Sequence, residues 1–384
     1  MDPQQILQFP HPGAPAAGAS LEIVPSLHWL RMPLPFALDH INLWLLEDGP
    51  GWTIVDCGIA TDLTQGLWEQ IFAAPPAGEP SGAHSRAFQA TRVLVTHYHP
   101  DHAGLAHWLC ERFGVTLWMS QAEYLTAHAI RENVAGYTPD NLLAMYRRNG
   151  LGGEGLEKMS VRGNRYRLAV PEFPHSYRRI MDGDEIAIGG RSWRVIMGYG
   201  HAPEHAALYC SELGVLISGD MVLPKISTNI SVWSIDPDGN PLKQFLDSLK
   251  RYAGLPNDTL VLPSHGLPFR GLRERVEQLE EHHLQHFREL HEACVRPLSA
   301  FEAIPTLFQR ELDTHQLFFA MGEAMAHLHY LFYQGSLRRQ TGADGVVRYL
   351  QDAAFRKEPV AKFILQRADP GEHEGGRPEG LDPP

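Results

Sequence analysis

The segment THYHPDHAG, residues 96–104, carries three histidines and an aspartate within six positions, directly after the apolar run VLV. The run predicts a buried strand, and the proline after it predicts a tight turn. His97 and His99 are two positions apart, so an extended backbone would point both imidazoles to the same side. Asp101 and His102 follow the turn and would occupy a second position beside the first. Imidazole and carboxylate groups that converge in this way are typical of metal sites, and the fold must supply more of them.

Three later segments place a side chain of metal-ligand type beside an apolar strand. His201 lies in the glycine-flanked loop GYGHAPEH, Asp220 ends the run GVLISGD, and His265 ends the run TLVLPSH. A polar group in such a position is costly to bury unless it is paired. Together with the first segment, these strand ends predict one polar cluster at the edge of a buried sheet.

The motifs HxHxDH, GHxPxH, SGD and SHG, in this order, resemble the metallo-β-lactamase superfamily of hydrolases, especially its glyoxalase II-like branch. The resemblance covers residues from about 21 to 270 and includes VDCG at 55–58, which is similar to the family's early aspartate turn. It implies an α+β fold, an αββα sandwich in which two mixed sheets pack together and helices cover their outer faces.

The resemblance also implies a site for two divalent metal ions. The first ion would be bound by His97, His99 and His201, the second by Asp101, His102 and His265, and Asp220 would bridge them. Zinc is the expected metal for a set rich in imidazole, with iron or manganese as alternatives. A hydroxide bridging the two ions would be the nucleophile, so no serine or cysteine triad is needed. Asp101 is the expected catalytic side chain, because it could orient that hydroxide or pass a proton to the leaving group.

Two positions bear on the branch of the superfamily. The related diiron oxygen-reducing enzymes have an acidic residue where this chain has His99, so the motif favours hydrolysis. Glyoxalase II-like members usually read GHTPGH or GHSPGH where this chain reads GHAPEH, so Glu204 replaces a glycine close to the metals. That departure leaves the substrate less certain than the metal site.

Five residues around the ligands are candidates for supporting or substrate-binding roles. The resemblance places Asp56 behind the metal loop, and His205 is expected to support the site rather than to bind metal. His40 could overhang the site or be a packing histidine. Tyr199 could donate to a developing oxyanion or be a loop aromatic residue, and Lys225 could pair with an anionic substrate or be a solvated lysine.

The composition divides the chain into a large and a small domain with flexible ends. Residues 1–20 and 366–384 are rich in proline, glycine and charge and are expected to be disordered. Residues 21–266 alternate short strands with helices and form the expected catalytic domain, with a helical insertion at about 121–180 that could be a lid, a pocket wall or decoration. Residues 267–355 contain helices followed by a hairpin, which indicates a mainly helical, winged-helix-like domain.

Two helical segments of this second domain raise further questions. The histidines at 282, 283, 286 and 291 lie among charged residues, and we expect them on a solvated helix face rather than at a metal. The segment HQLFFAMGEAMAHLHYLF is too apolar for a DNA-recognition helix, and we expect it to pack on the catalytic domain or on a second subunit of a homodimer.

Composition also limits the partners and the compartment. The formal net charge is -12 without a block of like charges, which argues against a general polyanion binder. The four cysteines form no CxxC pair and indicate reduced, buried thiols. No secretory signal and no apolar run of membrane-spanning length occurs, so a cytoplasmic protein without membrane contact is expected.

Three functions compete on these observations. The first is hydrolysis of a small-molecule thioester, ester or lactone, as in hydroxyacylglutathione hydrolase, and the charge and helical insertion favour it. The second is a phosphodiesterase or ribonuclease of the same superfamily, since winged-helix-like modules occur in members that cut RNA; the lack of a basic-aromatic stripe argues against nucleic acid. The third is a metal-sensing DNA-binding regulator, which the complete ligand set and the absence of a basic recognition helix disfavour.

Overall fold

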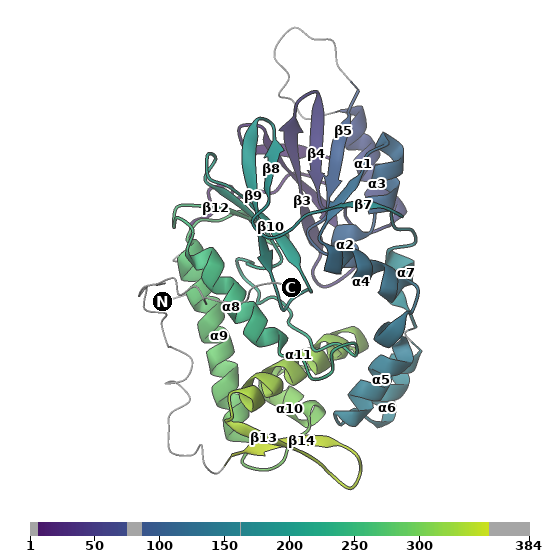
Figure 1. Ribbon diagram of the computed structural model, residues 1–384, viewed down its shortest axis with the longest axis vertical. Helices are drawn as coiled ribbons and strands as arrows, with labels where there is room; N and C mark the ends of the chain where they lie inside the picture. Colours follow the sequence, from purple (N-terminus) through teal and green to yellow (C-terminus); the bar gives the residue numbers. More distant parts are fainter. Residues whose placement is uncertain (1–6, 75–86, 162, 353–384) are drawn as a thin grey trace, which may run out of the picture.

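The computed structural model describes residues 7–74, 87–161 and 163–352, and its centre is a pair of sheets packed face to face (Figure 1). The first sheet contains seven strands in sequence order: β1 (Ser20–Val24), β2 (Leu27–Pro33), β3 (His40–Asp48), β4 (Gly51–Val55), β5 (Ala90–Leu94), β6 (Leu117–Met119) and β7 (Tyr177–Arg179). Strands β1 to β4 are antiparallel, whereas β4 to β7 run parallel. Helices connect the parallel strands, as such crossovers require.

The second sheet contains five strands in the order β12-β11-β10-β9-β8. Their bounds are β8 (Glu185–Ile188), β9 (Arg191–Gly198), β10 (His205–Cys210), β11 (Val215–Gly219) and β12 (Leu260–Pro263). Only the pair β11–β12 is parallel among the pairs of this sheet. Parallel strands that are buried on both faces are expected to be continuously apolar, and LVLP of β12 fits this rule.

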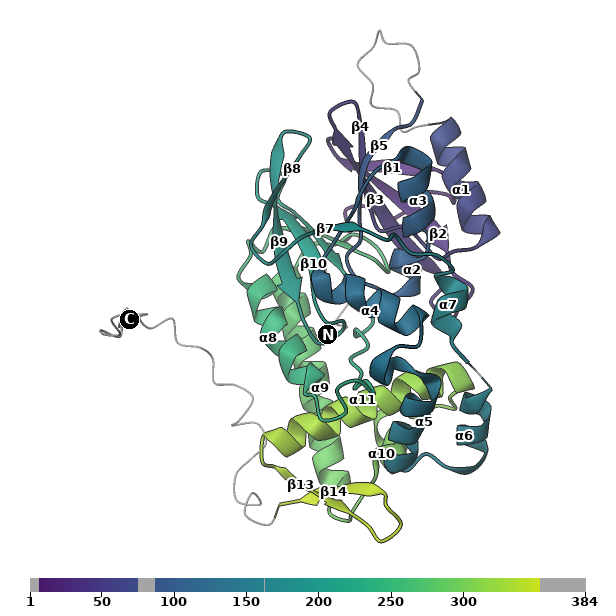
Figure 2. The same cartoon turned by 45° about the vertical axis from the view of Figure 1, so that its right-hand side comes forward.

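Large apolar side chains fill the space between the sheets, among them Trp29 and Trp44 of the first sheet and Trp193, Leu208 and Leu262 of the second. Helices α1 (Asp62–Ala73) and α3 (Ala106–Phe113) cover the outer face of the first sheet, and α8 (Pro241–Ala253) and α9 (Leu272–Ala293) lie on the side of the second (Figure 2). This arrangement is the αββα sandwich expected from the sequence.

The described residues of the 121–180 insertion form four helices: α4 (Gln121–Arg131), α5 (Pro139–Arg148), α6 (Gly153–Ser160) and α7 (Arg165–Ala169), with a 3₁₀ turn at Ala135–Tyr137. Helices α5 and α6 lie beside the C-terminal helices, where the Tyr146 hydroxyl donates to the backbone oxygen of Phe318 at 3.0 Å. The insertion therefore joins the sandwich to the C-terminal region rather than projecting as decoration.

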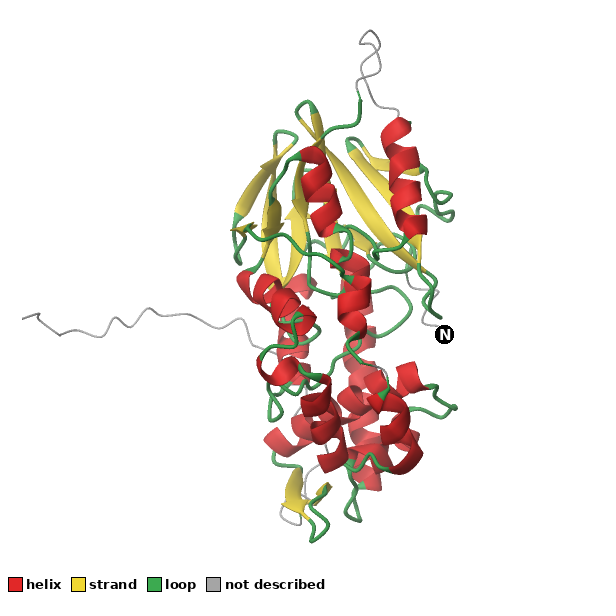
Figure 3. Cartoon of the chain, turned by 90° about the vertical axis from the view of Figure 1, so that its right-hand side faces the viewer, coloured by secondary structure: helices red, strands yellow, loops and turns green. Residues whose placement is uncertain are grey.

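The C-terminal region adds α10 (Ala300–Leu307), α11 (Thr314–Tyr333) and the hairpin of β13 (Leu337–Thr341) and β14 (Val347–Gln351). Its helices gather at one end of the sandwich (Figure 3), and one apolar cluster runs from the second sheet through α8 and α9 to α11. Residues 320–331 of α11 are all buried, which confirms that this helix packs within the molecule instead of facing DNA. The helix-and-hairpin order agrees with the expectation, while the winged-helix assignment stays a prediction.

Residues 7–20 differ from the expectation of disorder. Leu7 is buried against the same cluster as Phe269, and Gln8 and Arg270 exchange two backbone hydrogen bonds of 3.2 and 2.9 Å. Phe9 also packs on this cluster, and composition alone does not reveal these contacts. Residues 1–6 and the 366–384 tail lie outside the described residues.

All four cysteines are free and buried, as expected. Among the residues that the structure describes, no helix combines the length and the apolar character needed to cross a bilayer.

Candidate metal centre

The strand ends that carry the predicted ligands meet at one edge of the sandwich. In the first sheet, β4 ends before Asp56 and the parallel strand β5 ends before the His97–His102 loop, whose α2 helix spans Pro100–Ala103. In the second sheet, β11 and its parallel partner β12 end before Asp220 and His265. The carboxyl ends of neighbouring parallel strands lie at the same edge of a sheet. The residues that follow these strands are therefore close together in space.

The first predicted group is brought together. The ligand atoms of His97, His99, His201 and Asp220 all lie within 4.8 Å of one another. His97 Nε2 lies 2.9 Å from His99 Nδ1 and 3.2 Å from His201 Nε2. Three imidazole nitrogens therefore face one point from two different loops.

The second group, Asp101, His102 and His265, also has its ligand atoms within 4.8 Å of one another. Asp101 Oδ2 lies 3.4 Å from His265 Nε2 and 3.7 Å from His102 Nε2. Asp220 lies between the two groups and approaches both. Its Oδ1 lies 3.4 Å from His265 Nε2 and 3.5 Å from His102 Nε2, while its Oδ2 lies 3.4 Å from His201 Nε2. Each oxygen of this one carboxylate thus faces a different group of imidazoles.

The side chains have the chemistry that divalent cations require. Asp220 Oδ1 and His102 Nε2 are buried and make no hydrogen bond within the described part of the chain, although buried polar atoms are normally paired. Burial, followed by the neighbouring imidazoles, holds the pKa of both His97 and His99 well below its ordinary value, so each ring is neutral and has one nitrogen with a free lone pair. This set of nitrogen and oxygen donors fits two divalent metal ions.

The ring nitrogen that faces away from the centre is fixed by an acceptor in three of the histidines. His102 Nδ1 donates to Asp56 Oδ2 at 2.8 Å, His201 Nδ1 to the Asn229 backbone oxygen at 2.8 Å, and His265 Nδ1 to the His40 backbone oxygen at 2.7 Å. Such bonds orient each ring so that Nε2 is the nitrogen that faces the centre, as outer hydrogen bonds do for histidines that bind metals.

Asp56 lies behind the metal loop, where the resemblance placed it. Its backbone has a left-handed φ of 63°, a conformation that aspartate tolerates better than most residues. Its Oδ1 accepts from the Thr96 backbone N–H at 2.8 Å, and its Oδ2 accepts from His102. The carboxylate therefore holds both the loop and one ligand ring.

His205 supports the centre through the backbone of Asp220. The Asp220 N–H donates to His205 Nε2 at 3.1 Å, and burial lowers the pKa of this imidazole to about 3, which keeps it a neutral acceptor. Gly219 makes room for the ring: a Cβ there would lie 2.3 Å from the same nitrogen. His205 is absent from both groups of converging ligand atoms.

The three candidate substrate residues take other positions. His40, the first residue of β3, holds the His265 loop, because its Nε2 accepts from the Gly266 N–H at 2.8 Å. Tyr199 packs on the core between the sheets, with its backbone N–H bonded to Ser248, and Lys225 is exposed. None of the three lines the cavity described below.

Glu123 is a buried residue of the site that sequence reasoning missed. Its carboxyl accepts from the Tyr98 N–H at 2.9 Å and from the Glu204 N–H at 2.6 Å, so it joins the two loops that carry the first group of histidines. The Glu204 carboxylate accepts from the Ala122 N–H at 3.2 Å and belongs to neither group of converging ligand atoms. The one available signal was a carboxylate at the first turn of a helix in an apolar context, which is too common to be diagnostic.

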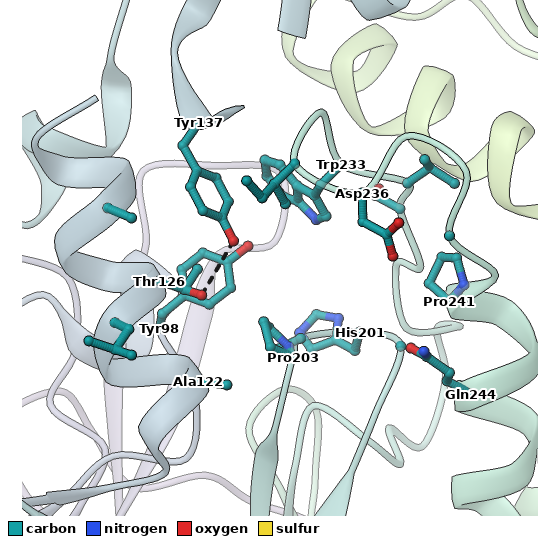
Figure 4. Close-up of a pocket in the computed structure, with 18 residues that line it drawn as sticks. Tyr98, Ala122, Thr126, Tyr137, His201, Pro203, Trp233, Asp236, Pro241 and Gln244 are labelled. Atoms are coloured by element: carbon teal, nitrogen blue, oxygen red, sulfur yellow. Dashed lines mark hydrogen bonds between the residues drawn. The ribbon is translucent and has the colours of Figure 1, made fainter. Parts of the chain in front are cut away.

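A cavity of about 530 Å³ opens beside His201 (Figure 4). Its walls come from the insertion helix α4, the turn at Tyr137, and the segment 231–244 that leads into α8. Tyr98 and Trp233 face the same space as His201, and the Tyr137 hydroxyl lies 3.4 Å from Thr126 Oγ1. Asp236 is the sole carboxylate among the described lining residues, and no lysine or arginine joins it.

Comparison with known proteins agrees with this architecture. The model of the Metallo-beta-lactamase superfamily matches residues 37–265, and that of the Metallo-beta-lactamase-like C-terminal domain matches residues 287–352. A crystal structure of a beta-lactamase domain protein from Burkholderia ambifaria is 47% identical with a TM-score of 0.84, covering 92% of this chain and 100% of that one.

Two more distant proteins extend the comparison. A metallo-beta-lactamase family protein from Thermus thermophilus is 31% identical, with a TM-score of 0.70, and the match covers 86% of this chain and 100% of that one. A probable metallo-hydrolase from Bacillus subtilis (strain 168) is 25% identical over 79% of this chain and 91% of its own length. With the family model matched from residue 37 to residue 265, a span that includes all seven predicted ligands, the chain belongs to the metallo-β-lactamase superfamily of metallo-hydrolases.

Proposed function

We propose that the protein hydrolyses a small thioester, ester or lactone at a centre of two divalent metal ions, with zinc as the expected metal. The observation that carries this proposal is the cavity beside His201, which has aromatic and aliphatic walls and no cationic side chain among its described lining residues. An acyl chain needs apolar walls next to one polarised carbonyl group, whereas a phosphodiester needs cations to hold its charge.

The ligands of the first ion would be His97, His99 and His201, those of the second Asp101, His102 and His265, with Asp220 shared. When bound, the two ions polarise a carbonyl oxygen and lower the pKa of water, which supplies the nucleophile. Asp56, Asn229 and the His40 backbone hold the ligand rings, and His205 holds the Asp220 backbone.

Asp101 is the side chain that we assign to proton transfer. Its side chain is 19% exposed, compared with 10% for Asp220, the other carboxylate of the two groups. Asp101 is therefore the more accessible of the two to the leaving group of a substrate. In this role Oδ1, the oxygen that does not face the ligand histidines, would hold the proton, while the cavity walls, Tyr98 and Trp233 among them, position the acyl group and exclude bulk water.

Two distant relatives support the thioester class. A hydroxyacylglutathione hydrolase from Rhodospirillum rubrum is 25% identical over 50% of this chain and 55% of its own length. An atrochrysone carboxyl ACP thioesterase from Aspergillus fumigatus is 22% identical over 64% of this chain and 57% of its own length. By their names, both relatives hydrolyse thioesters, and this reaction is consistent with the substrate class that we propose.

The test is a substrate panel with the zinc- or manganese-loaded protein. A glutathione thioester, an acyl-CoA, a lactone and bis-p-nitrophenyl phosphate would be compared at one enzyme concentration, with His99→Ala as the inactive control. We expect turnover of at least one of the first three that is lost in His99→Ala. Turnover of the phosphodiester alone would instead support the phosphodiesterase alternative.

A further inference from the structure

A second cluster of imidazoles lies outside the strand-end site, where α9 packs against α11. Its members are His282, His283 and His286 of α9 and Glu323 and His327 of α11. The sequence predicted a solvated face, but His283 and His327 are 0% exposed and Glu323 is 8% exposed. The prediction failed for His283, which faces His327 of α11, whereas His282 and His286 are half-buried.

The spacing of these residues brings their donor atoms together. His282 and His286 are four residues apart on one helix, as are Glu323 and His327 on the other, so each pair lies on one helical face. The ligand atoms of His286, Glu323 and His327 all lie within 4.8 Å of one another. Pairs of ligand residues on facing helices are how helical bundles build metal sites.

The tautomer of His327 is fixed as it is for the ligands of the principal centre. His327 Nδ1 donates to the Glu323 backbone oxygen at 2.9 Å, which leaves a lone pair on Nε2. His283 Nδ1 lies 3.1 Å from that nitrogen, an approach like that between His97 and His99. In both places, ring nitrogens converge at a separation that a shared cation can also bridge.

Several buried nitrogens of this cluster lack partners. His282 Nε2, His283 Nε2 and His286 Nδ1 make no hydrogen bond within the described part of the chain. The ligand atoms of His286 and His327 lie beside the Glu323 carboxyl. A set of neutral imidazoles beside a buried carboxyl is the donor chemistry that zinc and related transition ions prefer.

We propose that His286, Glu323 and His327 bind a further divalent transition-metal ion, such as Zn²⁺, which clamps α9 to α11. The site is separate from the strand-end ligands and is independent of the substrate class. It is linked to them by one residue: Glu323 Oε2 accepts from Asn229 Nδ2 at 3.3 Å, and the Asn229 backbone oxygen accepts from His201. The ion would therefore stabilise both the helix packing and the loop behind a principal ligand.

The test is the zinc content of matched variants. Wild type, His286→Ala, Glu323→Gln and the control His291→Ala, which lies on the same helix outside the cluster, would be stripped with a chelator. Each would then be reloaded with excess Zn²⁺, desalted, and measured by inductively coupled plasma mass spectrometry. We expect His286→Ala and Glu323→Gln to hold about one equivalent less than wild type and His291→Ala.

The comparison does not depend on how many ions the principal centre holds, because only the difference between variants is used. His286→Ala is the decisive variant, since His286 is half-buried and takes no part in the hydrogen bonds that link Glu323, Asn229 and His201. The rise in Tm on adding Zn²⁺ should also be smaller in this variant than in wild type. Zinc content and Tm response equal to those of wild type in His286→Ala would overturn the proposal.

Discussion

Asp220 is the residue on which the two groups of ligands depend. Its carboxylate oxygens face different histidines at 3.4 to 3.5 Å, and burial around Oδ1 leaves that oxygen without a hydrogen bond among the described residues. Burial alone would raise the pKa of this carboxyl, but His265 and His102 hold it well below its ordinary value. The group is therefore ionised and can offset the repulsion between two cations.

Substitutions of Asp220 and Asp56 should distinguish a shared metal ligand from a residue that only supports a ligand. Asp220→Ala is expected to lose bound metal and turnover together, because neither group keeps its shared ligand. Asp56→Asn keeps the left-handed backbone but weakens the hold on His102, so we expect metal affinity about 10–100-fold lower than in wild type. Metal titrations of the apoproteins measure both effects. Wild-type metal content and rate in Asp220→Ala would show that this carboxylate is not a ligand.

Glu123 gives the apoprotein a pH dependence of known sign. Burial raises the pKa of this carboxyl from 4.5 to about 8, so between these values the folded state binds a proton that the unfolded state has released. Stability should therefore fall as pH rises through this window, by at most about 1.4 kcal/mol per pH unit. Glu123→Gln cannot titrate and serves as the reference.

Urea unfolding of both apoproteins at pH 5 and pH 8 measures this dependence. The difference in free energy of unfolding, wild type minus Glu123→Gln, should be smaller at the higher pH. A difference that stays constant, or grows with pH, would mean that Glu123 is ionised in the folded protein throughout the window.

At the scale of elements, helix α11 supports the segment 228–236 that borders the cavity. The Val232 N–H donates to the Gly322 backbone oxygen at 3.2 Å, and a Cβ on Gly322 would lie 2.5 Å from Ser231 Oγ. Ser231 in turn donates to Asn229 Oδ1 at 2.7 Å. A glycine at this helical position therefore permits the close approach of a loop that holds His201.

Matched alanine substitutions test this contact. Gly66 lies within α1 and would present its Cβ to open space, so Gly66→Ala should stabilise the protein by about 0.5–1 kcal/mol through helix propensity. Gly322→Ala gains the same propensity but must displace Ser231, so we expect it to destabilise the protein. Thermal unfolding compares the two. Equal stabilisation by both substitutions would place α11 farther from the segment than described.

The elements show what a single sequence can and cannot predict. Apolar runs such as VLV and LVLP predicted strands, and the polar residues after them predicted converging ligands, because strand ends in such sheets share an edge. The wall at Trp233 and the carboxyl of Glu123 were missed, since they meet the ligands only through tertiary packing. His283 was assigned to solvent for the same reason. Periodicity identifies the two faces of a helix, but it does not show that a helix distant in the sequence, here α11, covers the polar face.

At the scale of the whole molecule, the cavity lies where the sandwich, the helical insertion and the segment leading to α8 meet. The net charge of -12 and the absence of lysine and arginine from the described lining residues argue against a polyanionic substrate. We expect cleavage of single-stranded RNA to be slow or absent at enzyme concentrations that hydrolyse a thioester or lactone. Efficient RNA cleavage that falls steeply with salt and disappears in His99→Ala would favour a nuclease.

The central claim is that seven side chains from four strand ends form one centre for two ions. Anomalous diffraction at the zinc edge, from crystals of the zinc-loaded protein, tests it most directly. We predict two peaks beside Asp220, one about 2.0–2.1 Å from nitrogens of His97, His99 and His201 and the other equally near His102 and His265. A single peak at full zinc loading, or peaks remote from Asp220, would contradict the account.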